Sequence, residues 1–147
     1  MKLSIKKFEE LTPGELYDII KLRNAVFVVE QNCVYQDLDG KDVNAYHVTL
    51  SDEEGIQAYL RVLDAGVSYS EPSLGRIISA KRRMGLGSAV VKAGIEVAKE
   101  KYGAGILRIS AQVQAMPFYE SLGFTAVSDV YDEDGIPHRE MVLEISE

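Results

Sequence analysis

Two glycines at the start of a predicted helix form the part of this sequence best suited to bind an anion. Gly85-Leu86-Gly87 follows a short apolar segment and the adjacent basic residues Arg82 and Arg83. The first turn of a helix leaves main-chain N–H groups unpaired and carries partial positive charge, and glycine lets an anion approach the backbone closely. The turn therefore indicates a phosphate site, with a merely flexible helix start as the alternative.

Two common nucleotide motifs do not fit this turn. The Walker A motif is absent, because no Gly-Lys-Ser or Gly-Lys-Thr follows the glycines. The dinucleotide fingerprint fails as well, since Val90 occupies the position of its third glycine. The glycines alone leave the kind of phosphate ligand open.

Hydrophobic periodicity predicts the elements that must position this turn. Thr12, Pro13 and Glu15 form a helix start with a capping box, and the apolar spacing continues to Phe27. A polar, Asp-rich segment follows at 31–41. Strands are expected at 3–8, 46–50, 56–62, 74–79, 106–110, 124–130 and 139–145. Helices are expected at 86–101 and in a short segment that has Pro117 in its first turn and Gly123 at its C-terminal end. The order predicts an α/β fold with a mixed sheet, in a single domain over residues 1–147.

Composition excludes several classes of function. The formal net charge is -7, which disfavours a nucleic-acid binder, although it is compatible with a cationic substrate. One cysteine and two histidines make a metal site improbable. No apolar run reaches the length of a signal peptide or a membrane span, so a cytoplasmic protein is expected.

Four ordered blocks carry a resemblance to a known family. RRMGLG at 82–87 resembles the acyl-CoA-binding motif of GNAT-superfamily acetyltransferases, and FYESLGF at 118–124 is similar to the block that closes their cofactor site. FVVEQ at 27–31 with YQDLDG at 35–40, and DGIPH at 134–138 with Met141, resemble the ElaA-type branch. The resemblance implies a GNAT-like fold with a mixed, mostly antiparallel central sheet flanked by helices. It also implies acetyl-CoA as co-substrate and an amine, small molecule or peptide, as acceptor.

The resemblance also assigns the cofactor contacts. The main-chain amides of Arg83, Met84, Gly85, Gly87 and Ser88 would hold the pyrophosphate, and Arg82 would add charge. The strand residues Ile77 and Ile78 would pair their backbone with the pantetheine arm, and one of their N–H groups would polarise the thioester carbonyl. Arg83 departs from the family pattern, which often has glycine there, so a side chain stands near the phosphates. The alternative for both arginines is a solvated basic surface.

Acyl transfer from a thioester needs a neutral amine and a way to release the thiolate. Tyr119 is the candidate acid for the leaving sulfur, its alternative being a tyrosine that packs beside Phe118. Glu30, His138 and Glu140 are candidate bases that the sequence does not rank, and a structural role is favoured for His138. His47 is expected to have no special task.

Several alternatives stay open. Cys33 would permit an acetyl-enzyme intermediate, although a buried thiol is the more common explanation, so direct transfer is expected.

The acidic loop 37–42 either lines an entrance for a cationic amine or keeps the surface soluble. A non-catalytic acetyl-CoA-binding sensor is the rival function. A homodimer through the C-terminal strands is compatible with the sequence.

Overall fold

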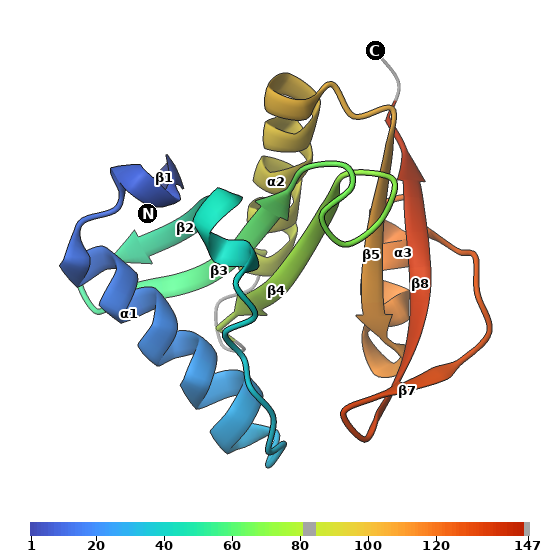
Figure 1. The fold of residues 1–147 in the computed structure, drawn as a ribbon, viewed down its shortest axis with the longest axis horizontal. Helices are drawn as coiled ribbons and strands as arrows, with labels where there is room; N and C mark the ends of the chain where they lie inside the picture. The colour runs from blue at the N-terminus through green and yellow to red at the C-terminus, as the bar shows by residue number, and fades with distance from the viewer. Residues whose placement is uncertain (81–84, 146–147) are drawn as a thin grey trace.

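One mixed sheet flanked by helices forms the described part of the molecule, as the sequence predicts (Figure 1). The computed structural model describes residues 1–80 and 85–145. The strands are β1 (Lys2–Lys7), β2 (Tyr46–Asp52), β3 (Gly55–Leu63), β4 (Ser73–Ser79), β5 (Ile106–Gln112), β6 (Thr125–Ala126), β7 (Tyr131–Glu133) and β8 (Ile136–Glu144). The helices are α1 (Pro13–Arg23), a π-helix (Asn24–Glu30), α2 (Leu86–Tyr102) and α3 (Met116–Ser121), with 3₁₀ turns at Phe8–Glu10, Lys41–Asn44 and Val113–Ala115.

The strand order is β1-β2-β3-β4-β5-β8-β6, and β7 pairs with β8 outside this path. Neighbouring strands are antiparallel except for β4 and β5, which are parallel and share a single paired position, Ser73 opposite Arg108. The N–H of Arg108 also donates to the Pro72 carbonyl at 3.0 Å. Beyond this junction the two strands separate toward their carboxyl ends, as Figure 1 shows. The sheet is therefore two halves joined at one point.

Local sequence signals account for the start of α1 and for the end of α2. The Thr12 hydroxyl accepts a hydrogen bond from the Glu15 N–H, and the Glu15 carboxylate accepts from the Thr12 N–H, so the predicted capping box is formed. Gly103 ends α2 with φ +60°, in the left-handed region that glycine enters without strain. Among the described residues, none of the helices has the length and apolar character needed to cross a membrane.

The two faces of the sheet carry separate apolar clusters. The larger cluster lies under α2 and includes Leu60, Leu74 and Val90, while the smaller lies under α1 and joins Ile19 to Ile78. These residues alternate along the strands as a half-buried sheet requires. The sheet and α2 are thus fixed by packing on both sides of β4.

Two predicted elements differ in the structure. The first helix changes into a π-helix at Asn24, and the N–H of Gln31 donates five residues back to the Val26 carbonyl at 3.3 Å. The strand expected at 124–130 is restricted to β6. The Val127 N–H still donates to the Glu140 carbonyl at 2.9 Å, but the Glu140 N–H donates to the Ser128 hydroxyl at 2.9 Å and not to a main-chain carbonyl. Tyr131 then begins β7, the missed first strand of a hairpin with β8.

Candidate active site

A cavity of about 1220 Å³ opens where β4 and β5 part. Its walls come from the carboxyl ends of these two strands, the π-helix, the segment after it, α3 and the β7–β8 hairpin. Three of the predicted catalytic residues, Tyr119, Glu30 and His138, line it together with Ile77 and Ile78. The structure therefore brings the candidate catalytic residues and the candidate strand to one space.

A bulge in β4 directs part of its backbone into this space. Arg76 has φ +53°, and the pairing of β4 with β3 shifts at this point. The N–H of Ala80 donates to β3 at 2.8 Å, and hydrogen-bonding direction alternates along an antiparallel ladder. The main-chain groups of Ile78 then face β3, while those of Ile77 face the open edge toward β5. Of the two predicted strand residues, Ile77 is the one with a free N–H toward the cavity.

The start of α2 presents the amides expected to hold a phosphate. Gly85 caps the helix with φ +85°, a conformation that costs other residues strain. Its carbonyl accepts the first helical bond, from the Ala89 N–H at 2.9 Å, so the amides between them have no partner within the helix. A Cβ on Gly87 would lie 3.2 Å from the Ser79 hydroxyl and 3.3 Å from the Phe118 ring. Gly87 therefore lets α2 approach β4 and α3 closely.

The other predicted phosphate contacts are Arg82, Arg83, Met84 and Ser88. Arg82, Arg83 and Met84 lie outside the described residues, so their predicted roles stay predictions. Ser88 lies in the first turn of α2, where its amide points in the same direction as that of Gly87.

Tyr119 is held by its ring. The side chain is 8% exposed and packs edge-on against Phe118 and Phe124, with ring centroids at 5.1 and 5.9 Å. Burial raises the pKa of Tyr119 to about 12, so the phenol is protonated at neutral pH. Tyr119 also lines the cavity. The residue therefore packs beside Phe118, as the alternative has it, and lies where the catalytic role would need it.

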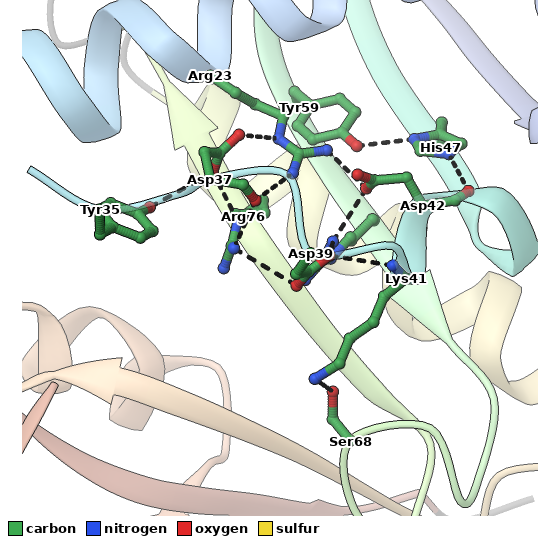
Figure 2. A network of polar contacts seen from close by, with 11 residues as sticks. Arg23, Tyr35, Asp37, Asp39, Lys41, Asp42, His47, Tyr59, Ser68 and Arg76 are labelled. Atoms are coloured by element: carbon green, nitrogen blue, oxygen red, sulfur yellow. Dashed lines mark hydrogen bonds and ion pairs between the residues drawn. The ribbon is translucent and has the colours of Figure 1, made fainter. Parts of the chain in front are cut away.

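A cluster of three arginines and three aspartates fixes the segment after the π-helix, and we call it the Arg–Asp cluster (Figure 2). Arg23, Arg61, Asp37 and Asp42 are buried, whereas Arg76 and Asp39 are partly exposed. Asp42 accepts from Arg23 at 2.6 Å and from Arg61 at 2.9 Å. The other ion pairs are Arg23 with Asp37 at 2.9 Å, Arg61 with Asp39 at 2.6 Å and Arg76 with Asp37 at 2.7 Å. Burial opposes ionisation of Asp42, but the Arg23 and Arg61 guanidinium groups hold its pKa below the ordinary value.

This arrangement bears on two expectations about the polar residues nearby. The aspartates of the acidic loop 37–42 pair with arginines, and Asp39 also lines the cavity. His47, for which no special task was expected, is buried beside the cluster. It donates through Nε2 to the Asp42 carbonyl at 3.0 Å and accepts at Nδ1 from the Tyr59 hydroxyl at 2.7 Å. Burial lowers the pKa of His47, which keeps this neutral form.

The three candidate bases differ in their surroundings. Glu30 is exposed at the end of the π-helix and has no ion pair within the described part of the chain. Glu140 is engaged by Arg108 at 2.8 Å. His138 is 7% exposed, and its Nε2 lies 3.2 Å from the carboxylate of Glu133, a cavity residue that the sequence did not single out. Glu133 was missed because the preceding strand was placed at 124–130 instead of in a hairpin with β8.

Comparisons with known proteins identify the family of this chain. Residues 20–145 match the family model described as an acetyltransferase (GNAT) domain. A UPF0039 protein of Synechocystis is 37% identical, over 97% of this chain and 94% of its own length. ElaA of Escherichia coli is 36% identical over 92% of each chain.

Solved structures give the same relation. The crystal structure of an acyl-CoA N-acyltransferase from Pseudomonas aeruginosa has a TM-score of 0.90 at 34% identity and covers 97% of this chain and 99% of its own. The crystal structure of E. coli ElaA has a TM-score of 0.89 at 33% identity, with the same coverage. The chain therefore belongs to the GNAT acetyltransferase family, in its ElaA-like branch.

Proposed function

We propose that this protein transfers the acetyl group of acetyl-CoA directly to the amine of a small molecule or peptide. Membership of an acyltransferase family supports group transfer in general. The observation that carries the finer proposal is Tyr119, a protonated phenol that lines the cavity between the strands that separate. A phenol that lines the cavity can donate its proton to a sulfur atom that arrives with the substrate.

The cofactor is expected to cross the open edge of β4. Its pyrophosphate would lie on the amides of Gly85, Gly87 and Ser88, with the residues at 82–84 supplying the remaining contacts of the motif. Its pantetheine arm would pair with the strand edge beside Ile77, and the Ile77 N–H would polarise the thioester carbonyl as negative charge develops on oxygen. The same pairing uses an edge that β5 leaves open.

The raised pKa of Tyr119 limits how its phenol can give a proton to the leaving thiolate. The thiolate of a thiol with a pKa near 8.5 is a weaker base than the Tyr119 phenolate, because the pKa of the Tyr119 phenol is about 12. Outright proton loss from the phenol would therefore cost on the order of 5 kcal/mol. We expect the Tyr119 hydroxyl to protonate the sulfur while the attacking nitrogen returns a proton to the phenol oxygen. The C–N bond forms, the C–S bond breaks, and CoA leaves as the thiol.

The first experiment compares binding with turnover. Calorimetry with CoA tests the cofactor site, and release of free thiol from acetyl-CoA with a panel of amines tests transfer. Tyr119→Phe keeps the ring packing and removes the hydroxyl, so kcat should fall by roughly 10²- to 10⁴-fold with little change in acetyl-CoA affinity. Full turnover in this variant would remove Tyr119 from the mechanism. Binding without turnover on any amine would favour the sensor instead.

A further inference from the structure

His138 and Glu133 form a polar pair on the cavity side of the β7–β8 hairpin. The Nδ1 atom of His138 lies 2.7 Å from the Ile136 carbonyl oxygen, and its Nε2 atom lies 3.2 Å from Oε2 of Glu133. The imidazole stacks on the Tyr131 ring at a centroid distance of 6.2 Å and an interplanar angle of 23°. The ring is therefore fixed in position by one hydrogen bond and one stacking contact.

The hydrogen-bond partners determine where the protons of this pair lie. A carbonyl oxygen only accepts, so the proton of a neutral His138 ring is on Nδ1 and its lone pair is on Nε2. An ionised Glu133 carboxylate also only accepts, so two acceptors face one another across 3.2 Å. One additional proton on Nε2 would satisfy both groups. The geometry is thus that of two groups that can share one proton between Nε2 and Oε2.

The sheet places this pair opposite the other candidate groups. In the ladder, His138 lies between Gln112 of β5 and Tyr131 of β7. His138 and Glu133 line the same cavity as Tyr119, and half of the Glu133 side chain is exposed, which leaves it open to the cavity. Glu30 shares the cavity but has no fixed partner among the described residues, and Glu140 is already paired with Arg108.

We propose that His138 is the base that accepts the proton of the incoming ammonium and that Glu133 is the positioning residue that favours this transfer. The inference rests on the proposed acetyl transfer. The ammonium R–NH₃⁺ gives one proton to Nε2 of His138, which becomes an imidazolium held by the Glu133 carboxylate. The free amine then attacks the thioester carbonyl, the C–S bond breaks with Tyr119 as donor to sulfur, and the imidazolium later releases its proton to water. One proton is released for each acetyl group transferred.

The test uses chemical rescue, which a structural role for His138 would not produce. His138→Ala should lower kcat by roughly 10²-fold or more while acetyl-CoA binding is retained, and added imidazole should restore a concentration-dependent part of the rate. Glu133→Gln keeps the size and removes the charge on a half-exposed side chain, so it should fold and lower kcat more than it raises the acceptor KM. Its effect should largely disappear when His138 is already alanine, because the two residues act as one unit.

Asp132→Asn is the matched control. This neighbouring residue loses the same charge, does not line the cavity, and accepts a hydrogen bond from the Gly135 N–H at 3.1 Å that an asparagine oxygen can also accept. It should keep the wild-type rate. A wild-type rate in His138→Ala, or a slow variant that binds CoA but does not respond to imidazole, overturns the role of His138. A wild-type rate in Glu133→Gln overturns that of Glu133, and both results leave acetyl transfer intact. A wild-type protein that transfers to no amine overturns the inference and the proposed function together.

Discussion

Replacement of Asp42 by asparagine tests whether the Arg–Asp cluster stabilises the fold. The carboxylate is buried and accepts from both Arg23 and Arg61. Asparagine keeps the shape and one acceptor but removes the charge, which leaves the two buried arginines, Arg23 and Arg61, and the partly exposed Arg76 facing two aspartates. Removing one partner of a buried ion pair typically costs 3–5 kcal/mol. We expect about 3 kcal/mol here, because Arg23 retains Asp37 and Arg61 retains Asp39.

Urea unfolding at neutral pH measures this loss. With a slope of about 2 kcal/mol/M, the midpoint should fall by roughly 1.5 M. Lys6→Gln is the control: it breaks the half-exposed Lys6–Glu15 pair and should cost less than about 1 kcal/mol. A loss for Asp42→Asn that matches the control would refute the reasoning that the Arg–Asp cluster holds the segment after the π-helix.

We expect Asp42→Asn also to change how the free energy of unfolding depends on pH. In the folded protein the pKa values of Asp39 and Asp42 lie below their ordinary range, because arginine contacts outweigh the effect of burial. A lowered folded pKa contributes stability that is complete above the unfolded value of about 4 and is lost as pH falls below it. The wild type should therefore weaken from about pH 4 downward, and Asp42→Asn should weaken less steeply. Parallel pH curves for the two proteins would contradict this assignment.

Two further substitutions test packing and mechanism. Gly94→Val should destabilise the protein by about 1–3 kcal/mol in the same urea assay, because a Cβ at Gly94 would lie only 2.9 Å from Leu60 and 3.1 Å from Leu74; an unchanged midpoint would show that both leucines move aside freely. Cys33→Ala should keep the full rate of thiol release with any accepted amine, because its thiol donates to the Asp134 carbonyl at 3.1 Å and direct transfer needs no acetyl-enzyme. A loss of turnover in this variant would favour the covalent route.

Features set by neighbours in the chain could be predicted from the sequence. Thr12 and Glu15 form their capping box within four residues, and Gly103 ends α2 through its own backbone freedom. The strand that precedes the glycine turn and the helix that follows it were also placed within a residue or two. In each of these positions the energy that determines the structure is local.

Features set by distant pairs could not be predicted in the same way. Asp42 is 19 residues from both Arg23 and Arg61, and nothing in its immediate neighbours distinguishes it from a solvated aspartate. The π-helix at Asn24–Glu30 has a sequence that also fits an α-helix, and only its packing under the sheet separates the two. Glu133 becomes a candidate only once the β7–β8 hairpin is known, because the hairpin brings its carboxylate close to His138.

The single junction between β4 and β5 has a consequence for catalysis. Arg108 secures it by pairing bidentately with Glu71, which precedes β4, at 3.0 and 3.1 Å, and by reaching Glu140 of β8 at 2.8 Å. The proposed cofactor contacts at Ile77 and the start of α2 lie in one half of the sheet, whereas Tyr119 and His138 belong to the other. A fully paired β4–β5 ladder would have placed these groups precisely but closed the edge that the cofactor needs. Instead, charge-assisted hydrogen bonds from Arg108, which are stronger than neutral ones, hold β4 and β5 together at their junction. The carboxyl ends of the two strands stay apart, which leaves room for the proposed substrates.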